Sequence, residues 1–107
     1  MLVKTLMDAV GVASEESQTG AIVLFHMAKS NRGIASMRCT GYSGSGNLVT
    51  KVEGRLSESM EWVSVSSKNL NANETLNDED MQLFPEMRAT CVAASGANGT
   101  VTVQVGG

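Results

Sequence analysis

The sequence predicts an all-β fold: a small antiparallel β-sandwich, jelly-roll or immunoglobulin-like, with six to eight short strands. Two observations lead to this prediction. The β-prone runs are short and are separated by clusters of Gly, Ser and Asn, which is typical of strands joined by tight turns. Within several runs apolar and polar residues alternate, which places them on opposite faces of a strand. A chain of 107 residues is long enough for one domain with its own core.

Six runs are expected to form strands, and turn signals separate most of them. The clearest turns are Ser-Gly-Ser-Gly-Asn at 43–47 and Ser-Gly-Ala-Asn-Gly at 95–99, because Gly and Asn tolerate positive φ angles. The Asn-rich stretch 68–78 predicts a long exposed loop instead. The expected strands are residues 20–29, 34–42, 48–55, 61–66, 86–94 and 100–105.

Alternation along these strands predicts which side chains form the core. In the last strand three valines share one face, and threonine and glutamine occupy the other. Cys39 and Cys91 each share a strand face with a methionine, so both are expected to be buried. Because we expect no export signal, we expect reduced thiols, with a disulfide between them as the alternative. The residues expected to be buried together are Val52, Trp62, Met87, Val101 and Val103.

The first 19 residues are interpreted as an N-terminal arm and linker, and residues 20–107 as the sandwich domain. The arm fits either a short amphipathic helix or, as we favour, a strand or extended segment. Its apolar residues Leu2, Leu6 and Val10 are expected either to contact a partner or to fold back as an edge strand of the same domain. Both alternatives are open at this stage.

Charge and hydropathy exclude several function classes. The net charge is −3 and no basic stripe is present, which argues against direct nucleic-acid binding. No apolar run approaches the 18 or more residues that a membrane-spanning helix needs. The N-terminal segment lacks the features of a signal peptide, so we expect no export signal.

No residue pattern indicates an enzyme or a cofactor. His26 lies in an apolar run without an obvious nucleophile or acid partner. The acidic group at 77–80 lacks the spacing of a calcium loop, so it is interpreted as solvated. The single Trp62 is interpreted as a core anchor rather than as a platform for sugar stacking.

Four segments carry a resemblance to a known family. They are Thr-Leu-Met-Asp-Ala-Val at 5–10, the hairpin-like stretch from Val49 to Trp62, Phe-Pro-Glu-Met-Arg at 84–88, and the Gly-rich turn leading into Thr-Val-Thr-Val at 100–103. Their order resembles that of small β-sandwich virion structural proteins of tailed bacteriophages, the decoration or auxiliary capsid type. The resemblance covers nearly the whole chain.

The resemblance implies a non-enzymatic part of a phage particle. We expect a capsid decoration protein or head-fibre base on the outer shell, forming a homo-oligomer and binding the major capsid protein or other virion proteins. A tail or neck component is the alternative within the particle. The competing class is a carbohydrate-binding module that would use Trp62 and Tyr42.

Overall fold

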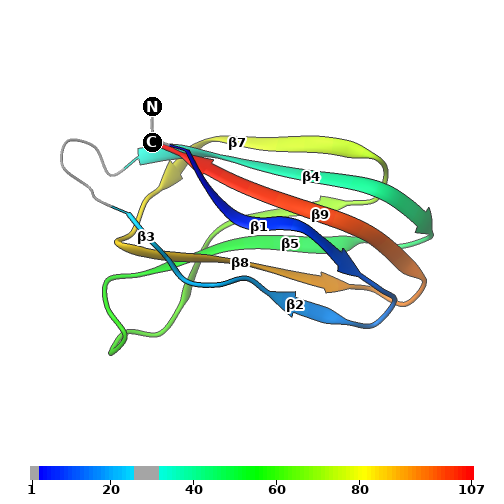
Figure 1. Ribbon diagram of the computed structural model, residues 1–107, viewed down its shortest axis with the longest axis horizontal. Coiled ribbons are helices and arrows are strands. Elements are labelled where there is room, and N and C mark those ends of the chain that lie inside the picture. The colour runs from blue at the N-terminus through cyan, green and yellow to red at the C-terminus, as the bar shows by residue number, and fades with distance from the viewer. Residues whose placement is uncertain (1–2, 26–31) are drawn as a thin grey trace.

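Two antiparallel β-sheets pack face to face in a computed structural model that describes residues 3–25 and 32–107 (Figure 1). The predicted all-β sandwich is confirmed, with nine strands in this part of the chain instead of six to eight. The described residues contain no helix that could cross a membrane. The strands are β1 Val3–Val12, β2 Ser17–Thr19, β3 Val23–Leu24, β4 Arg32–Gly44, β5 Leu48–Arg55, β6 Val63–Leu70, β7 Glu74–Gln82, β8 Glu86–Ala93 and β9 Ala97–Gly106.

Both sheets pair strands that are distant from each other in the sequence. One sheet has the order β1-β9-β4-β7, and the other has the order β2-β8-β5-β6, with β3 also paired to β8. The first long strand therefore lies beside the last one, and β5 lies between its sequence neighbour β6 and the distant strand β8 (Figure 1).

The two predicted turns pack against each other at one end of the sandwich. Gly44 and Gly96 both have positive φ angles, 88° for each. The backbone N–H of Ser45 donates to the carbonyl oxygen of Gly96 at 3.0 Å. A β-carbon on Gly44 would overlap that same carbonyl group. Glycine is therefore required at position 44 both for its backbone conformation and for the close approach of the two turns.

The core lies between the sheets and follows the predicted alternation. Val52, Met87, Val101 and Val103 are fully buried, as predicted, and so are Cys39 and Cys91. Val101 and Val103 come from β9, whereas Val52 and Met87 come from the opposite sheet. Methionine, valine and leucine supply most of the buried volume, and Thr50 is among the few buried polar residues.

The prediction for Trp62 was wrong, because this side chain lies outside the core. It is half-buried and belongs to the connection between β5 and β6 rather than to a strand. Strand β6 begins at Val63, so the alternation that was expected to turn position 62 inward does not start until the next residue.

The loop predicted for residues 68–78 was also wrong. Strand β6 continues to Leu70, and β7 begins at Glu74. Strand β7 is at the edge of its sheet, so it pairs along one side only and tolerates a polar sequence. Leu70 of β6 and Met81 of β7 are buried and attach these two polar strands, one in each sheet, to the core. Ser66 of β6 donates a hydrogen bond to Asp78 of β7 at 2.8 Å, which ties the two sheets together.

The run predicted as one strand at 20–29 contains only the short strand β3 within the described residues. Residues 26–29, including His26, lie outside the described residues. The short strands β2 and β3 both pair with β8.

Residues 3–12 form β1, which pairs antiparallel with β9 over its whole length. Irregularities interrupt the register on both sides of Met7, and Ala9 has a positive φ of 49°. The Ala9 N–H donates to Oγ1 of Thr102 at 3.1 Å, which satisfies a backbone group that the bulge removes from the ladder. Residues 3–12 thus belong to the same sheet as the end of the chain.

Candidate interaction surface

Trp62 lies on the outer face of the sheet formed by β5 and β8. The guanidinium carbons of Arg55 and Arg88 are each 4.3 Å from the centroid of the indole ring. Both distances are within the range of cation–π attraction, for which tryptophan is the most favourable ring. The loop between β5 and β6 is therefore held over this face by its last residue.

Two ion pairs fix the arginines beneath the indole. Arg55 Nε is 2.8 Å from Oε1 of Glu86, and Arg88 Nε is 2.8 Å from Oε1 of Glu53. Each pair joins direct register partners across β5 and β8. The four side chains are only 15% to 27% exposed, so solvent screens them less than it screens a fully exposed ion pair. We call Glu53, Arg55, Trp62, Glu86 and Arg88 the Trp62 cluster.

The local backbone explains why all these side chains point outward. Gly54 and Met87 are register partners, both are buried, and they lie between the charged residues along their strands. Because successive strand residues face opposite sides, Glu53 and Arg55 must point away from the core, as must Glu86 and Arg88.

Exposed apolar side chains flank the Trp62 cluster. Leu24 of β3 pairs with Glu86 and is 63% exposed, and Leu56, which follows Arg55, is also 63% exposed. At the other end of the same face, Val92 is 51% exposed and pairs with the half-buried Val49. A Trp–Arg centre with apolar neighbours has the composition of protein-interface hot spots.

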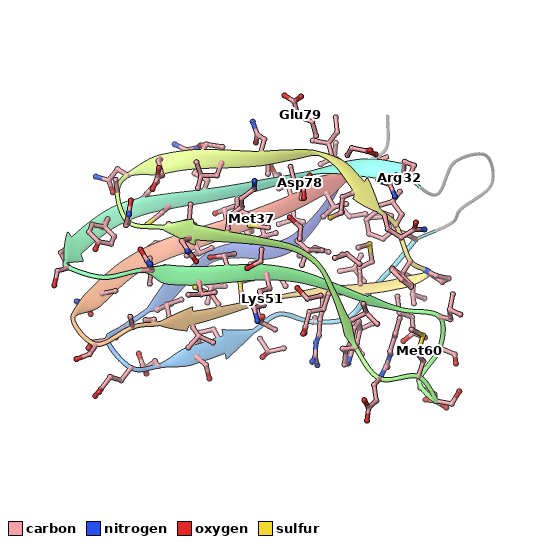
Figure 2. All side chains as sticks on the ribbon, turned by 180° about the vertical axis from the view of Figure 1, so that it is seen from behind. Arg32, Met37, Lys51, Met60, Asp78 and Glu79 are labelled. Atoms are coloured by element: carbon pink, nitrogen blue, oxygen red, sulfur yellow. The ribbon has the colours of Figure 1, made fainter. Side chains whose placement is uncertain are left out.

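The loop that carries Trp62 is closed by its own contacts. The backbone N–H of Met60 donates to the carbonyl oxygen of Ser57 at 3.0 Å, and the sulfur of Met60 accepts from the N–H of Leu56 at 3.4 Å. Figure 2 shows Met60 in this loop, which turns sideways from the end of β5. These two contacts fix the conformation of the loop that carries the Trp62 indole.

Tyr42 and Trp62 do not form a common platform. Tyr42 lies at the end of β4, where its hydroxyl donates to the carbonyl of Gly46 at 2.6 Å. Trp62 contacts Arg55, the last residue of β5, whereas Gly46 just precedes the start of that strand. Seven residue steps of about 3.3 Å separate the ends of β5 by about 23 Å. A sugar ring cannot stack on both aromatics.

The three N-terminal residues proposed as partner anchors have different placements. Leu2 lies outside the described residues. Leu6 is 4% exposed and belongs to the domain's own core, so it cannot also serve as an exposed anchor. Val10 is half-buried and packs against that core.

Both cysteines are free thiols inside the sandwich, Cys39 on β4 and Cys91 on β8. Thr50 Oγ1 donates to the Cys91 sulfur at 3.5 Å. Burial raises the pKa of both thiols, and the negative charge that an ionised Cys91 would carry raises the pKa of Cys39 further. The thiols are therefore poor nucleophiles in the folded protein.

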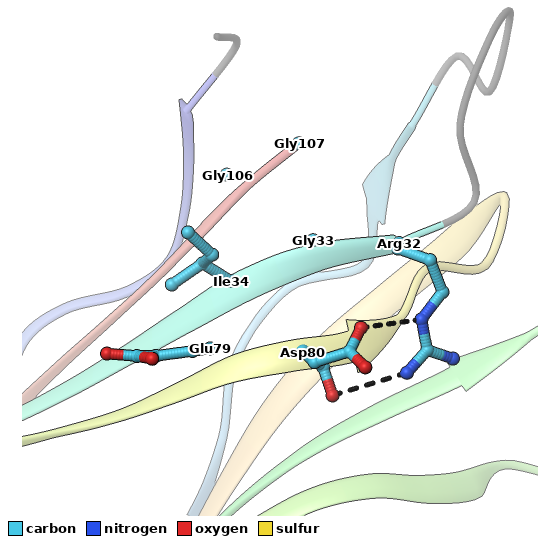
Figure 3. A pocket seen from close by; sticks show the side chains of 7 residues that line it. All are labelled: Arg32, Gly33, Ile34, Glu79, Asp80, Gly106 and Gly107. Atoms are coloured by element: carbon cyan, nitrogen blue, oxygen red, sulfur yellow. Dashed lines mark hydrogen bonds and ion pairs between the residues drawn. The ribbon is translucent and has the colours of Figure 1, made fainter.

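A shallow hollow of about 270 Å³ lies at the opposite sheet, between β4, β7 and the end of β9 (Figure 3). Its charged groups are Glu79 and an ion pair in which Arg32 Nε donates to Oδ1 of Asp80 at 2.8 Å. This hydrogen bond holds the pKa of the Asp80 carboxyl below its usual value. In residues 3–25 and 32–107 no three metal-ligating side chains come together. The hollow offers no pairing of nucleophile and base.

The chain matches no family model and no curated protein. Its fold is similar to that of a solved structure described as "Crystal structure of PirA", with a TM-score of 0.54. The two sequences are 11% identical, and the similarity covers 95% of this chain and 89% of that one. At this identity the similarity shows a shared fold alone.

Sequence reasoning missed the Trp62 cluster. The charges at positions 53, 55, 86 and 88 alternate with core residues, so their outward orientation was readable from the sequence. Their pairing was not, because it depends on β5 and β8 lying side by side, and about 30 residues separate the partners in the chain.

Proposed function

We propose that this protein is a structural component of a tailed-phage virion, a capsid decoration protein or head-fibre base on the outer shell. The proposal rests on the four sequence segments that resemble such proteins. One observation supports it most: these segments are brought together pairwise. Thr5–Val10 lies in β1 beside the Thr-Val-Thr-Val segment of β9, and the 49–55 and 86–88 segments lie side by side in β5 and β8.

The pairing gives the four segments a common structural role, because each then contributes to the scaffold of the sandwich. Here the segments 5–10 and 100–103 contact each other, and the segments 49–62 and 84–88 build the Trp62 cluster. The four segments therefore form two of the strand pairs that build the sandwich, β1 with β9 and β5 with β8. A subunit that adds to a particle needs such a scaffold and exposed faces, and it needs no active site.

The net charge of −3 favours a position on the outside of the shell over contact with packaged DNA, because phosphate repels an acidic protein. A tail or neck component would share these features and is the second candidate. The carbohydrate-binding alternative is less well supported, because Tyr42 and Trp62 are far apart and the indole already contacts two guanidinium groups.

The experiment that tests this function is quantitative mass spectrometry of purified particles. Hundreds of copies per particle are expected for shell decoration, and about a dozen would indicate the neck or tail instead. Particles made without the protein should recover it when the purified chain is added. Absence from washed particles, together with no rebinding to the deficient ones, would overturn the proposal.

A further inference from the structure

We propose that the outer face of the β1-β9-β4-β7 sheet holds one basic side chain, a lysine or an arginine, of a partner protein. The stem of that side chain would lie over Gly106, between Val3 and Ile34, and its cation would reach the carboxylate of Glu79. The inference concerns the sheet opposite the Trp62 cluster and does not depend on the virion role.

One row of register partners leaves a gap on this face. Gly106 of β9 pairs with Val3 of β1 on one side and with Ile34 of β4 on the other. The chain neighbours Val105 and Ala35 are fully buried, so Gly106 and Ile34 face outward. Because glycine has no side chain, the row has a gap between two aliphatic walls. Val3 is 53% exposed and Ile34 is 39% exposed, so both walls are accessible.

A β-bulge in β7 places a carboxylate at the end of the same row. The register between β4 and β7 shifts at Ile34, so that Glu79 and Asp80 together lie opposite this one residue. Figure 3 shows Glu79 extending to the same side as Ile34, whereas Asp80 turns toward Arg32. Bulges of this kind re-aim side chains, and here the bulge separates two adjacent carboxylates.

The two carboxylates differ in their partners. Asp80 accepts a hydrogen bond from Nε of Arg32 at 2.8 Å, and the same guanidinium donates to Oε1 of Gln82. Within residues 3–25 and 32–107, the Glu79 carboxylate forms no hydrogen bond or ion pair. A cation that reaches Glu79 would therefore complement a charge that this part of the chain leaves unpaired.

Open space connects the aliphatic walls to this carboxylate. A shallow hollow of about 190 Å³ is lined by Val3, Ile34, Ser36, Gln104 and Gly106. It adjoins the hollow of about 270 Å³ that Glu79 lines, since Ile34 and Gly106 border both. We call the two adjoining hollows the Gly106 slot.

The row next to the Gly106 slot is polar and uncharged. It consists of Thr5, Gln104, Ser36 and Asn77, which are register partners across the four strands. Nε2 of Gln104 donates to Oγ1 of Thr5 at 3.3 Å, which holds the amide toward β1. No charge in this row would repel an incoming cation.

An apolar slot that ends at a carboxylate matches an alkyl chain that ends in a cation. Lysine and arginine cover apolar surface with their stems while their charged heads stay in water. Two inter-strand spacings, about 10 Å, separate the backbones at Gly106 and Glu79, and a lysine and a glutamate side chain together span this distance. A purely aliphatic side chain would leave Glu79 unpaired, and an acidic one would be repelled.

The test uses the full chain, labelled with nitrogen-15, and tripeptides that differ in one side chain. Acetyl-Ser-Lys-Ser-amide and its arginine counterpart, at millimolar concentrations, are expected to shift the amide signals of Val3, Ile34, Glu79 and Gly106. The norleucine counterpart has the stem of lysine without the charge. It should bind about threefold more weakly, which is the effect expected of an exposed ion pair.

Two matched variants test the role of the carboxylate. Glu79→Gln should abolish the preference for lysine over norleucine, because it removes only the charge. Glu58→Gln removes the same charge from an exposed position in the loop between β5 and β6 and should leave the preference unchanged. Thermal melts report whether both variants fold. Ile34→Ser, which removes one aliphatic wall, should weaken the binding of all three peptides.

Unchanged signals at the Gly106 slot with both basic peptides, up to tens of millimolar, would overturn the proposal. So would equal binding of the lysine and norleucine peptides, or a lysine preference that persists in folded Glu79→Gln, because the carboxylate would then play no part. Signals of the slot that move with protein concentration alone would show that a second copy covers it, which would also overturn the assignment to a different partner.

Discussion

Gly54 of β5 lies directly against the ring of Phe84, between the outward-facing Glu53 and Arg55. A β-carbon built at this position would lie 2.5 Å from Cδ1 of Phe84 and 2.7 Å from its Cγ. The phenyl ring therefore occupies the space that any other residue would need. The absence of a side chain allows Glu53 and Arg55 to keep their positions on either side.

Gly54→Ala should lower the free energy of unfolding by about 1–3 kcal/mol, because overpacking forces the ring or the strand to move. Urea denaturation followed by circular dichroism measures this. Gly11→Ala is the control, since nothing lies within 4 Å of a β-carbon there, and its effect should stay within about 0.5 kcal/mol. Equal stability losses for the two variants would contradict the packing described for Phe84.

The thiols of Cys39 and Cys91 should react with a thiol reagent only as fast as the protein opens. Both are buried, and burial raises their pKa values above the ordinary 9.0. Labelling of the native protein followed by intact mass measures the rate, and urea should accelerate it strongly. Rapid labelling of either cysteine without denaturant would show that its strand is misplaced.

The same pKa shifts predict a loss of stability at alkaline pH. The unfolded chain ionises its thiols near their ordinary pKa of 9.0, before the folded protein does. The stabilisation is therefore complete below that pH and is lost as pH rises through the higher folded pKa values. Unfolding free energies at pH 7 and pH 10 should differ more for the wild type than for the Cys39→Ala, Cys91→Ala double variant.

At the scale of single elements, the residues of β1 differ in how much they contribute to stability. Leu6 is 4% exposed, and Val3, three residues earlier on the same strand, is 53% exposed. Leu6→Ala should cost about 2–5 kcal/mol of stability, whereas Val3→Ala should cost less than about 0.5 kcal/mol. Thermal melts compare the two, and an unchanged melting temperature for Leu6→Ala would mean that β1 does not belong to the core.

Strands with strong alternation could be predicted from the sequence, and polar edge strands could not. Residues 86–94 and 100–105 carry a continuous apolar face, and they form β8 and much of β9. The sequence of β7 reads as a loop, because an edge strand pairs on one side and exposes most of its side chains. Its only fully buried residue is Met81, too little to produce a recognisable period.

The sequence predicts which residues of the candidate surface face outward, but not how they pair. Local alternation indicates that Glu53 and Arg88 face outward, but a strand pattern does not say which strand lies beside it. Trp62 was assigned to the core because large aromatics are usually buried. Its two guanidinium contacts come from β5 and β8 together, so they follow from the topology.

At the scale of the whole molecule, the fold depends on contacts between distant parts of the chain. The pairs β1–β9, β4–β9 and β5–β8 all join segments far apart in sequence. Because such contacts require large loops to close first, folding should take milliseconds to seconds. Stopped-flow refolding followed by the fluorescence of Trp62 measures this, and a microsecond phase with full amplitude would contradict it.

The pairing of β1 with β9 also determines how the protein would carry a mechanical load. Val3 lies opposite Gly106, so the two ends of this strand pair point the same way from one end of the sandwich. Antiparallel hydrogen bonds run perpendicular to the strands. A pull that separates Val3 from Gly106 would therefore break these hydrogen bonds one after another, starting at that end of the strand pair. A pull between Val3 and the turn at Ser45, at the opposite end, would load many bonds at once in shear. The same molecule would be compliant when Val3 and Gly106 are pulled apart and stiff when it is stretched along its length.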